Sequence, residues 1–131
     1  MAERRIEAPL VAHRVIDGDT LEASLGVRLP VRLAGIDTPE LSVAAQKTAA
    51  TVAKAHARRW LAESDRRGLT MLARVEELGQ YGRLVGDIIR PATGETLAAY
   101  LLAAGVAVPS DGTRRHQWTD EELRRIEKLA P

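Results

Sequence analysis

The chain contains no cysteine, which excludes structural disulfides, thiolate metal sites and cysteine nucleophiles. Any bound metal must therefore use oxygen or imidazole ligands, and oxygen ligands favour hard cations. Aromatic residues are also scarce, with two Trp, two Tyr and no Phe, so a surface built on rings that stack with nucleic-acid bases is not expected. The formal net charge of +1 gives little electrostatic steering toward a polyanion. It neither supports nor excludes a nucleic-acid partner.

Long apolar runs are absent as well. No stretch approaches the roughly 20 apolar residues that a membrane-spanning helix needs, and the charged start from Met1 to Glu7 lacks the apolar run of a signal peptide. We therefore expect a cytoplasmic protein without membrane association. A length of 131 residues fits one domain over 1–131 with a substantial core of its own, and we expect a monomer.

Short apolar alternations broken by glycines predict antiparallel strands, and an alanine-rich stretch between them predicts a long amphipathic helix. Two shorter helices follow, the last beginning at a capping box formed by Thr119 and Glu122. The predicted strands are 11–16, 20–25, 27–33, 68–77 and 81–90, and the predicted helices are 42–62, 97–104 and 119–129. This order predicts an α+β domain: a five-stranded OB-fold-type β-barrel with three α-helices.

The strand predicted at 27–33 divides its side chains between two faces. Val31 and Leu33 share the apolar face, and Arg32 lies on the opposite one, because successive strand residues point to opposite sides of a sheet. Pro30 cannot donate a hydrogen bond to a neighbouring strand, so we expect an edge or a bulge at this point.

Three clusters combine charge with predicted strand ends. Asp17 and Asp19 flank a glycine after the first strand, a pattern that is also typical of a simple turn. Arg32 is followed by Asp37-Thr-Pro-Glu40, where the proline fixes the chain and can direct two carboxylates and the Thr38 carbonyl toward one cavity. The third cluster is Gln80-Tyr-Gly-Arg83.

Phosphodiester cleavage needs a cation on a nonbridging oxygen, a group that activates or orients water, and positive charge for the transition state. These clusters contain all three. Two aspartates with a backbone carbonyl suit calcium, which accepts six to eight oxygen ligands in loose geometry. Arginine suits phosphate because its planar fork donates two hydrogen bonds and stays charged.

Taken together, the clusters resemble the staphylococcal nuclease, or thermonuclease, family in their order, in their spacing and in the helix between them. The resemblance runs from about residue 10 to 108 and rests on Val15-Ile-Asp-Gly-Asp-Thr20, on Arg32 with Ile36-Asp-Thr-Pro-Glu40, and on Tyr81-Gly-Arg83. It implies the barrel fold and a calcium-dependent nuclease that hydrolyses phosphodiester bonds of DNA or RNA with little sequence preference and leaves 3′-phosphate products.

The same resemblance implies a role for each matching residue. Asp19, Asp37 and the Thr38 carbonyl would hold calcium, and Glu40 would activate or position the attacking water. Arg32 and Arg83 would bind the scissile phosphate, and Tyr81 would contact substrate. Asp17 would either support the metal site through a hydrogen bond or stabilise a turn.

The sequence departs from this family after residue 105, where the secreted members carry tyrosines and this chain has Pro109-Ser-Asp-Gly. Each stacked base is worth about 1–3 kcal/mol, so weaker substrate binding is expected. The segment Arg114-Arg-His116 is predicted to be a solvated loop, with phosphate contact as the alternative, and His56 is predicted to be a buried helix residue. A noncatalytic nucleic-acid-binding module remains the alternative function, and a protein-interaction domain is the third hypothesis.

Overall fold

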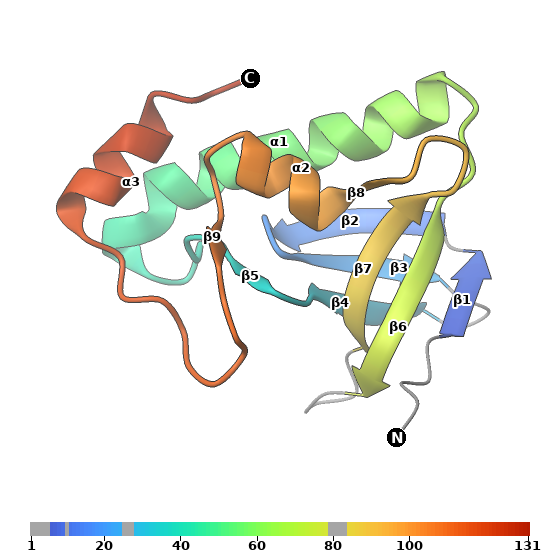
Figure 1. The fold of residues 1–131 in the computed structure, drawn as a ribbon. Coiled ribbons are helices and arrows are strands. Elements are labelled where there is room, and N and C mark those ends of the chain that lie inside the picture. The colour runs from blue at the N-terminus through green and yellow to red at the C-terminus, as the bar shows by residue number, and fades with distance from the viewer. Residues whose placement is uncertain (1–5, 10, 25–27, 79–83) are drawn as a thin grey trace.

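The computed structural model describes residues 6–9, 11–24, 28–78 and 84–131 of the chain (Figure 1). Its strands are β1 (Ile6–Pro9), β2 (Val11–Asp17), β3 (Thr20–Ser24), β4 (Arg28–Leu33), β5 (Ile36–Asp37), β6 (Leu72–Leu78), β7 (Leu84–Arg90), β8 (Glu95–Thr96) and β9 (Val108–Pro109). Its helices are the 3₁₀ turn η1 (Ala44–Gln46) and the α-helices α1 (Lys47–Arg66), α2 (Leu97–Ala103) and α3 (Asp120–Glu127).

Most of the strands form one sheet in the order β1-β6-β7-β4-β3-β2, with β8 paired to β7, while β5 and β9 form a separate pair. All pairings are antiparallel except the parallel one between β4 and β7. Figure 1 shows β6 and β7 crossing the direction of β2, β3 and β4 steeply, so the sheet is strongly curled. The long helix lies in the sequence between two groups of strands. This order of elements agrees with the predicted α+β domain with three α-helices.

The predicted five-stranded closed barrel is not confirmed. Its five strands correspond to β2, β3, β4, β6 and β7, but four shorter strands are added, and within the described residues no pairing joins β1 to β2 to close the sheet. Gly86 permits the close approach of β6 and β7, because a Cβ there would lie 2.0 Å from the Arg74 carbonyl oxygen. A side chain at this position would force the two strands apart.

Pro30 lies opposite Glu22 of β3, and within the described residues the pairing of β4 with β7 covers Val31 to Leu33. The residues that precede Leu84 lie outside the described part of the chain, so the edge or bulge expected at Pro30 stays a prediction. Val31 and Leu33 are buried in the core, and Arg32 is only partly buried. The predicted division of this strand into two faces is confirmed for these three residues.

The long helix begins later and ends later than predicted. Residues 42–46 form a turn and η1, and α1 runs from Lys47 to Arg66. Its buried face includes Ala49, Ala53, His56 and Trp60, which shows the expected spacing of three and four residues. The His56 Nε2 atom lies 2.5 Å from the Leu129 carbonyl oxygen, so this histidine is a buried structural residue as predicted.

The extension of α1 beyond the prediction is explained by Arg90, whose side chain is 1% exposed. Its guanidinium donates to the Trp60 carbonyl and to Ser64 Oγ, both at 2.7 Å, and lies 4.0 Å from the centre of the Trp60 ring. Glu95 pairs with the same group at 3.1 Å. These contacts stabilise the last turns of α1.

The last helix begins at the predicted capping box. Thr119 Oγ1 accepts from the Glu122 N–H at 3.2 Å, and Glu122 Oε1 accepts from the Thr119 N–H at 2.9 Å. In Figure 1, α3 lies beside the N-terminal end of α1. Among the helices that the structure describes, none has both the length and the apolar character needed to cross a membrane.

Candidate active site

Asp19 and Asp37 come from different elements of the fold and pair with the same arginine, Arg32. Asp19 lies in the turn between β2 and β3, and Asp37 ends β5. Both are 1% exposed. Gly18 permits this approach, because a Cβ there would lie 2.9 Å from Ala53 Cβ and 3.0 Å from two side-chain atoms of Thr38.

Arg32 bridges the two aspartates. Its Nη2 donates to Asp37 Oδ1 at 2.5 Å, and its Nη1 lies 3.2 Å from Asp19 Oδ2. The same Nη1 donates to the Leu33 carbonyl at 2.7 Å. A buried carboxylate without a partner costs several kcal/mol, so this guanidinium is a structural requirement of the cluster as well as a candidate phosphate ligand.

The chain after Asp37 is held by hydrogen bonds from three directions. The Thr38 N–H donates to Asp19 Oδ2 at 3.1 Å, and the Glu40 N–H donates to Gln46 Oε1 at 2.9 Å. Asp17 Oδ1 accepts from the Leu41 N–H at 3.1 Å. Asp17 therefore positions the loop that carries Glu40, and its support of a metal site stays a prediction.

The structure adds Arg115 to these residues, and its guanidinium lies against four oxygen atoms. The Nη1 atom is 3.4 Å from Asp19 Oδ2 and 3.1 Å from Asp37 Oδ1. The Nη2 atom is 3.4 Å from the Thr38 carbonyl oxygen and 2.7 Å from Glu40 Oε1. Arg115 lies in an exposed loop, as predicted for 114–116, but the sequence did not predict that its guanidinium pairs with the carboxylates.

His116 also contacts the site. Its backbone N–H donates to Asp37 Oδ2 at 2.8 Å, and its ring Nε2 lies 2.9 Å from Glu122 Oε2. The Trp118 ring packs edge-on against the imidazole, with the ring centres 4.6 Å apart. Residues 115 and 116 thus bring the segment between β9 and α3 onto the carboxylates.

The Glu122 carboxylate is stabilised in its charged form. The backbone hydrogen bond from Thr119 lowers the pKa of Glu122, and the hydrogen bond and charge of His116 lower this pKa further. Glu122 thus stabilises the start of α3 and also contacts the imidazole of His116 in the preceding loop.

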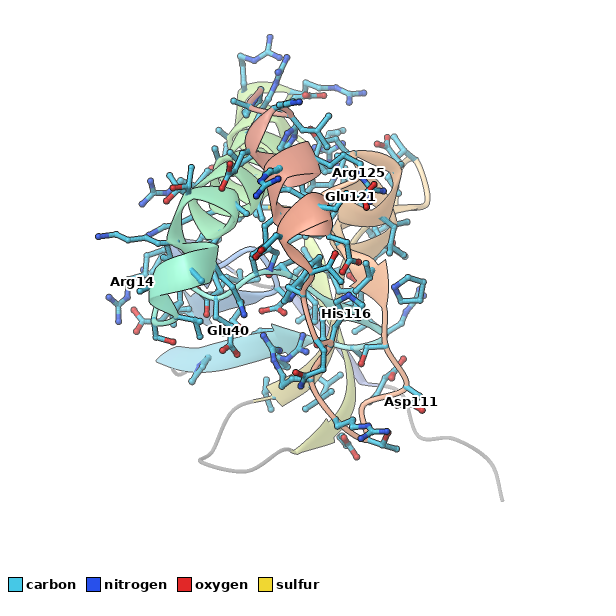
Figure 2. The ribbon with its side chains drawn as sticks, turned by 90° about the vertical axis from the view of Figure 1, so that its left-hand side faces the viewer. Arg14, Glu40, Asp111, His116, Glu121 and Arg125 are labelled. Atoms are coloured by element: carbon cyan, nitrogen blue, oxygen red, sulfur yellow. The ribbon has the colours of Figure 1, made fainter. Side chains whose placement is uncertain are left out.

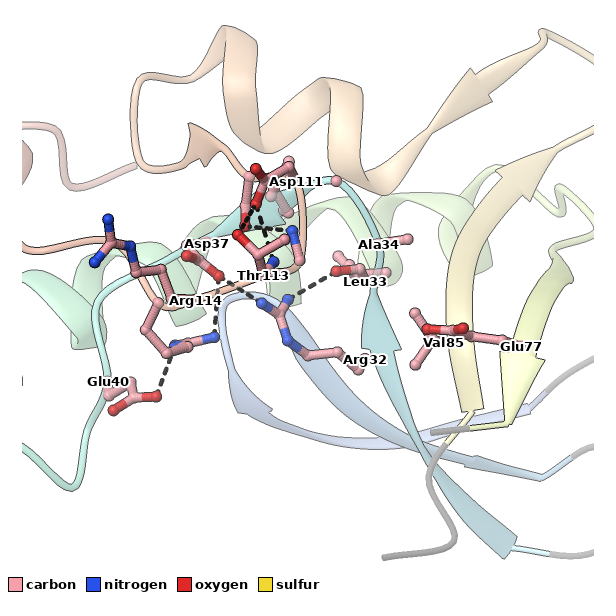
Figure 3. A pocket seen from close by; sticks show the side chains of 15 residues that line it. Arg32, Leu33, Ala34, Asp37, Glu40, Glu77, Val85, Asp111, Thr113 and Arg114 are labelled. Atoms are coloured by element: carbon pink, nitrogen blue, oxygen red, sulfur yellow. Dashed lines mark hydrogen bonds and ion pairs between the residues drawn. The ribbon is translucent and has the colours of Figure 1, made fainter. Parts of the chain in front are cut away.

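A cavity of about 860 Å³ opens beside Arg32 (Figure 3). Its walls include Asp37 and Glu40 on one side, Val85 of β7 on another, and the segment 110–115. Pockets of about 300–1,000 Å³ are typical of ligand sites. Glu40, with a side chain 35% exposed, thus lies at the edge of a space large enough for a nucleotide.

The predicted residues Tyr81 and Arg83 lie outside the described part of the chain, as do Gly79 and Gln80. The other predicted site residues (Asp17, Asp19, Arg32, Asp37, Thr38 and Glu40) are brought together as described above. Sequence reasoning missed Arg115 and His116 because they lie 78 and 79 residues from Asp37, to which each is hydrogen-bonded. Only the clustering of basic residues after Pro109 hinted at them.

The oxygen atoms around Arg115 have the chemistry that a calcium ion requires. Carboxylates and backbone carbonyls are the usual ligands of this ion, and here two aspartates and the Thr38 carbonyl already converge on one cationic group. Within the described ranges, no three His, Asp or Glu side chains form a metal-binding group by themselves. The two aspartates therefore fit a hard cation only when a backbone oxygen, such as the Thr38 carbonyl, or water supplies the remaining ligands.

Comparison with known proteins supplies independent information. A family model described as staphylococcal nuclease homologue matches residues 30–131. The match includes Arg32 and the segment from Asp37 to Glu40, and it begins after Asp19. No curated protein matches the chain.

Proposed function

Because this chain belongs to the staphylococcal nuclease homologue family, we propose that it is a calcium-dependent nuclease that hydrolyses phosphodiester bonds of DNA or RNA with little sequence preference. One observation carries the proposal: two buried aspartates and a backbone carbonyl converge on a cationic group beside Arg32 and Glu40. We also propose that the chain acts as a cytoplasmic monomer.

In this proposal Asp19, Asp37 and the Thr38 carbonyl hold the calcium ion. Calcium would place positive charge against a nonbridging phosphate oxygen and so lower the cost of adding a fifth oxygen to phosphorus. The burial of both aspartates, each 1% exposed, supports this role, because electrostatic attraction to a cation is stronger away from water.

Glu40 positions or deprotonates the attacking water. Its side chain lies at the edge of the cavity, and its backbone is fixed by Gln46, so its position relative to the aspartates is defined. The water oxygen bonds to phosphorus while the bond to the 5′-oxygen breaks. The 5′-oxygen takes up a proton, and the other product keeps the phosphate on its 3′-oxygen.

Arg32 and Arg83 neutralise the phosphate. Arg32 lines the cavity, and its guanidinium carries five N–H donors, of which those bonded to Leu33 and Asp37 are only a part. The assignments of Arg83 and of Tyr81 as a substrate contact rest on the sequence resemblance.

A noncatalytic nucleic-acid-binding module is the second candidate. One observation favours it: Arg115 pairs with the carboxylates, so part of the negative charge that would attract a metal is balanced within the chain itself. The scarcity of aromatic residues counts against it, because such modules depend on base stacking.

A cleavage assay separates the two functions. Purified protein is incubated with plasmid or single-stranded DNA, with calcium or with a calcium chelator. If the protein is a calcium-dependent nuclease, the DNA is cleaved with calcium and is not cleaved with the chelator. Cleavage that persists in the chelator would contradict the metal role, and binding without cleavage would favour the second candidate.

Two glutamate variants test the site itself. Glu40→Gln should slow cleavage at least about 100-fold, as loss of an acid–base group does. Glu121→Gln, the same change on an exposed residue of α3, is the matched control and should cleave normally. Arg83→Ala should also lose activity, and full activity in that variant would remove Arg83 from the mechanism.

A further inference from the structure

Arg115 holds the central position in the site, although its segment was expected to be a solvated loop or, alternatively, to contact phosphate. Its two terminal nitrogens contact Asp19, Asp37, Glu40 and the Thr38 carbonyl at 2.7–3.4 Å. These are the oxygens assigned above to the metal and to the attacking water. A guanidinium and a calcium ion cannot both occupy this position, because their charges repel and their ligands are the same.

We propose that Arg115 is an internal cation that competes with the metal, so that the metal binds only when this side chain leaves the carboxylates. The inference rests on the proposed function, because it assumes that the site binds calcium. It assigns Arg115 a role in setting metal affinity, not in the chemical step.

The charges of the cluster support a competing cation. Three carboxylates face the two guanidinium groups of Arg32 and Arg115. Without Arg115, Arg32 is the one cation among the described residues that pairs with the two buried aspartates. A cation at the position of Arg115 therefore stabilises the metal-free protein, and a bound metal would replace it there.

The loop is built so that the side chain can leave without unfolding its surroundings. Arg115 lies between β9 and α3, outside the helices and strands, and its side chain is 41% exposed. His116 remains anchored through its backbone to Asp37 and through its ring to Glu122. Figure 2 shows Glu40 and His116 on the same side of the molecule, and the cavity beside Arg115 gives the guanidinium space to enter.

Competition of this kind lowers metal affinity by a predictable rule. The observed dissociation constant equals the intrinsic one divided by the fraction of molecules whose site is open. If the arginine covers the site about nine-tenths of the time, its removal tightens binding roughly tenfold. Arg115→Gln keeps the length and polarity of much of the side chain and removes the charge.

The test is isothermal titration of calcium chloride into the full chain, after metal has been removed by dialysis against chelator. The variants are Arg115→Gln and Arg115→Lys, with Arg114→Gln as the control. Arg114 is the exposed neighbour, and its replacement changes the net charge by the same amount. We expect binding roughly tenfold tighter in Arg115→Gln, an intermediate effect in Arg115→Lys, and little change in Arg114→Gln.

The outcomes separate this inference from the proposed function. Equal or weaker calcium binding in Arg115→Gln would overturn the competition and leave the metal site intact. The same tightening in Arg114→Gln would overturn it too, because the effect would then come from net charge alone. Binding in Arg115→Gln but not in the wild type would support the competition in its strongest form. Absence of binding in every variant would overturn both proposals.

A second measurement tests the contact without any metal. In chelator, Arg115→Gln should lower the melting temperature relative to Arg114→Gln, because the buried aspartates lose the cation that Arg115 places beside them. Calcium should then raise the melting temperature of Arg115→Gln more than that of the wild type. An unchanged melting temperature in chelator would show that Arg115 does not neutralise the site and would overturn the inference.

Discussion

The backbone N–H of His116 donates a 2.8 Å hydrogen bond to the carboxylate of Asp37, across 79 residues of sequence. The imidazole of the same residue pairs with Glu122 in the first turn of α3. The position of the loop over the acidic cluster therefore depends on the start of the last helix, although that helix contributes no candidate ligand.

Replacement of Glu122 should change how stability depends on pH. Its folded-state pKa is lowered, mainly by the Thr119 N–H and then by His116. The stability that the carboxylate contributes is present above its unfolded pKa, near 4.5, and is lost as the pH falls through the lower folded value. Glu122→Gln can still form the capping box, so we expect it to lack this acid-dependent loss. Urea unfolding from about pH 3 to pH 7 measures it, and Glu121→Gln should behave like the wild type.

Asp87 should give the opposite pH dependence. Burial raises its pKa above the ordinary value of 3.8, although the N–H groups of Ala98 and Ile88 donate to it. The ionised form therefore destabilises the folded state, and this cost appears as the pH rises from the unfolded pKa through the raised folded pKa.

Asp87→Asn keeps the accepting oxygen and cannot ionise. Its free energy of unfolding relative to the wild type should increase from about pH 4 upward and then become constant. Asp65→Asn, at an exposed position of α1, is the control and should show no such trend. A relative stability of Asp87→Asn that does not vary with pH would contradict the prediction.

Removal of the Arg32 charge should be costly. Its partners are both buried, with side chains 2% exposed, and Arg32→Met should lower the free energy of unfolding by about 3 kcal/mol, as loss of one partner of a buried ion pair does. Arg14→Met removes an exposed ion pair with Glu22 and should cost less than about 1 kcal/mol. Denaturant unfolding measures both, and equal costs would show that the buried pair is not a structural requirement.

Gly18 should tolerate no side chain while Ala53 keeps its own. Gly18→Ala places two Cβ atoms 2.9 Å apart, and overpacking of this kind costs about 1–3 kcal/mol. Adding Ala53→Gly removes the contact, so the double variant should be more stable than the sum of the single effects predicts. Strict additivity in this double-mutant cycle would show that contact with Ala53 is not the source of the cost of Gly18→Ala.

Local patterns predicted much of this fold. Alternation in 27–33 placed Arg32 opposite Val31 and Leu33, and the capping box located the start of α3. These features depend on neighbours within a few residues. The two-residue strands β5, β8 and β9 were missed because segments this short have no measurable period. The closed barrel was expected because only five strands were counted, and the additional strands change that count.

The acidic half of the site was predictable because its residues follow strand ends in a recognisable order. Asp19, Asp37 and Arg32 do come together, whereas their roles in metal and phosphate binding stay predictions, as do those of Arg83 and Tyr81. Arg115 and His116 were not predictable in the same way. A loop that returns to the site 78 residues after Asp37 leaves no periodic signal, and only three-dimensional structure shows where it ends.

The parallel pairing of β4 with β7 has a consequence for local opening. Arg32 lies opposite Thr20 on one side and Val85 on the other, so its backbone can exchange amide hydrogens only when the centre of the sheet unfolds. Arg115, between Pro109 and the capping box, belongs to a segment that can open at far lower free energy. The part of the site that contains Arg32 therefore opens only with the fold as a whole. The segment that carries Arg115 can be rearranged by a ligand at small energetic cost.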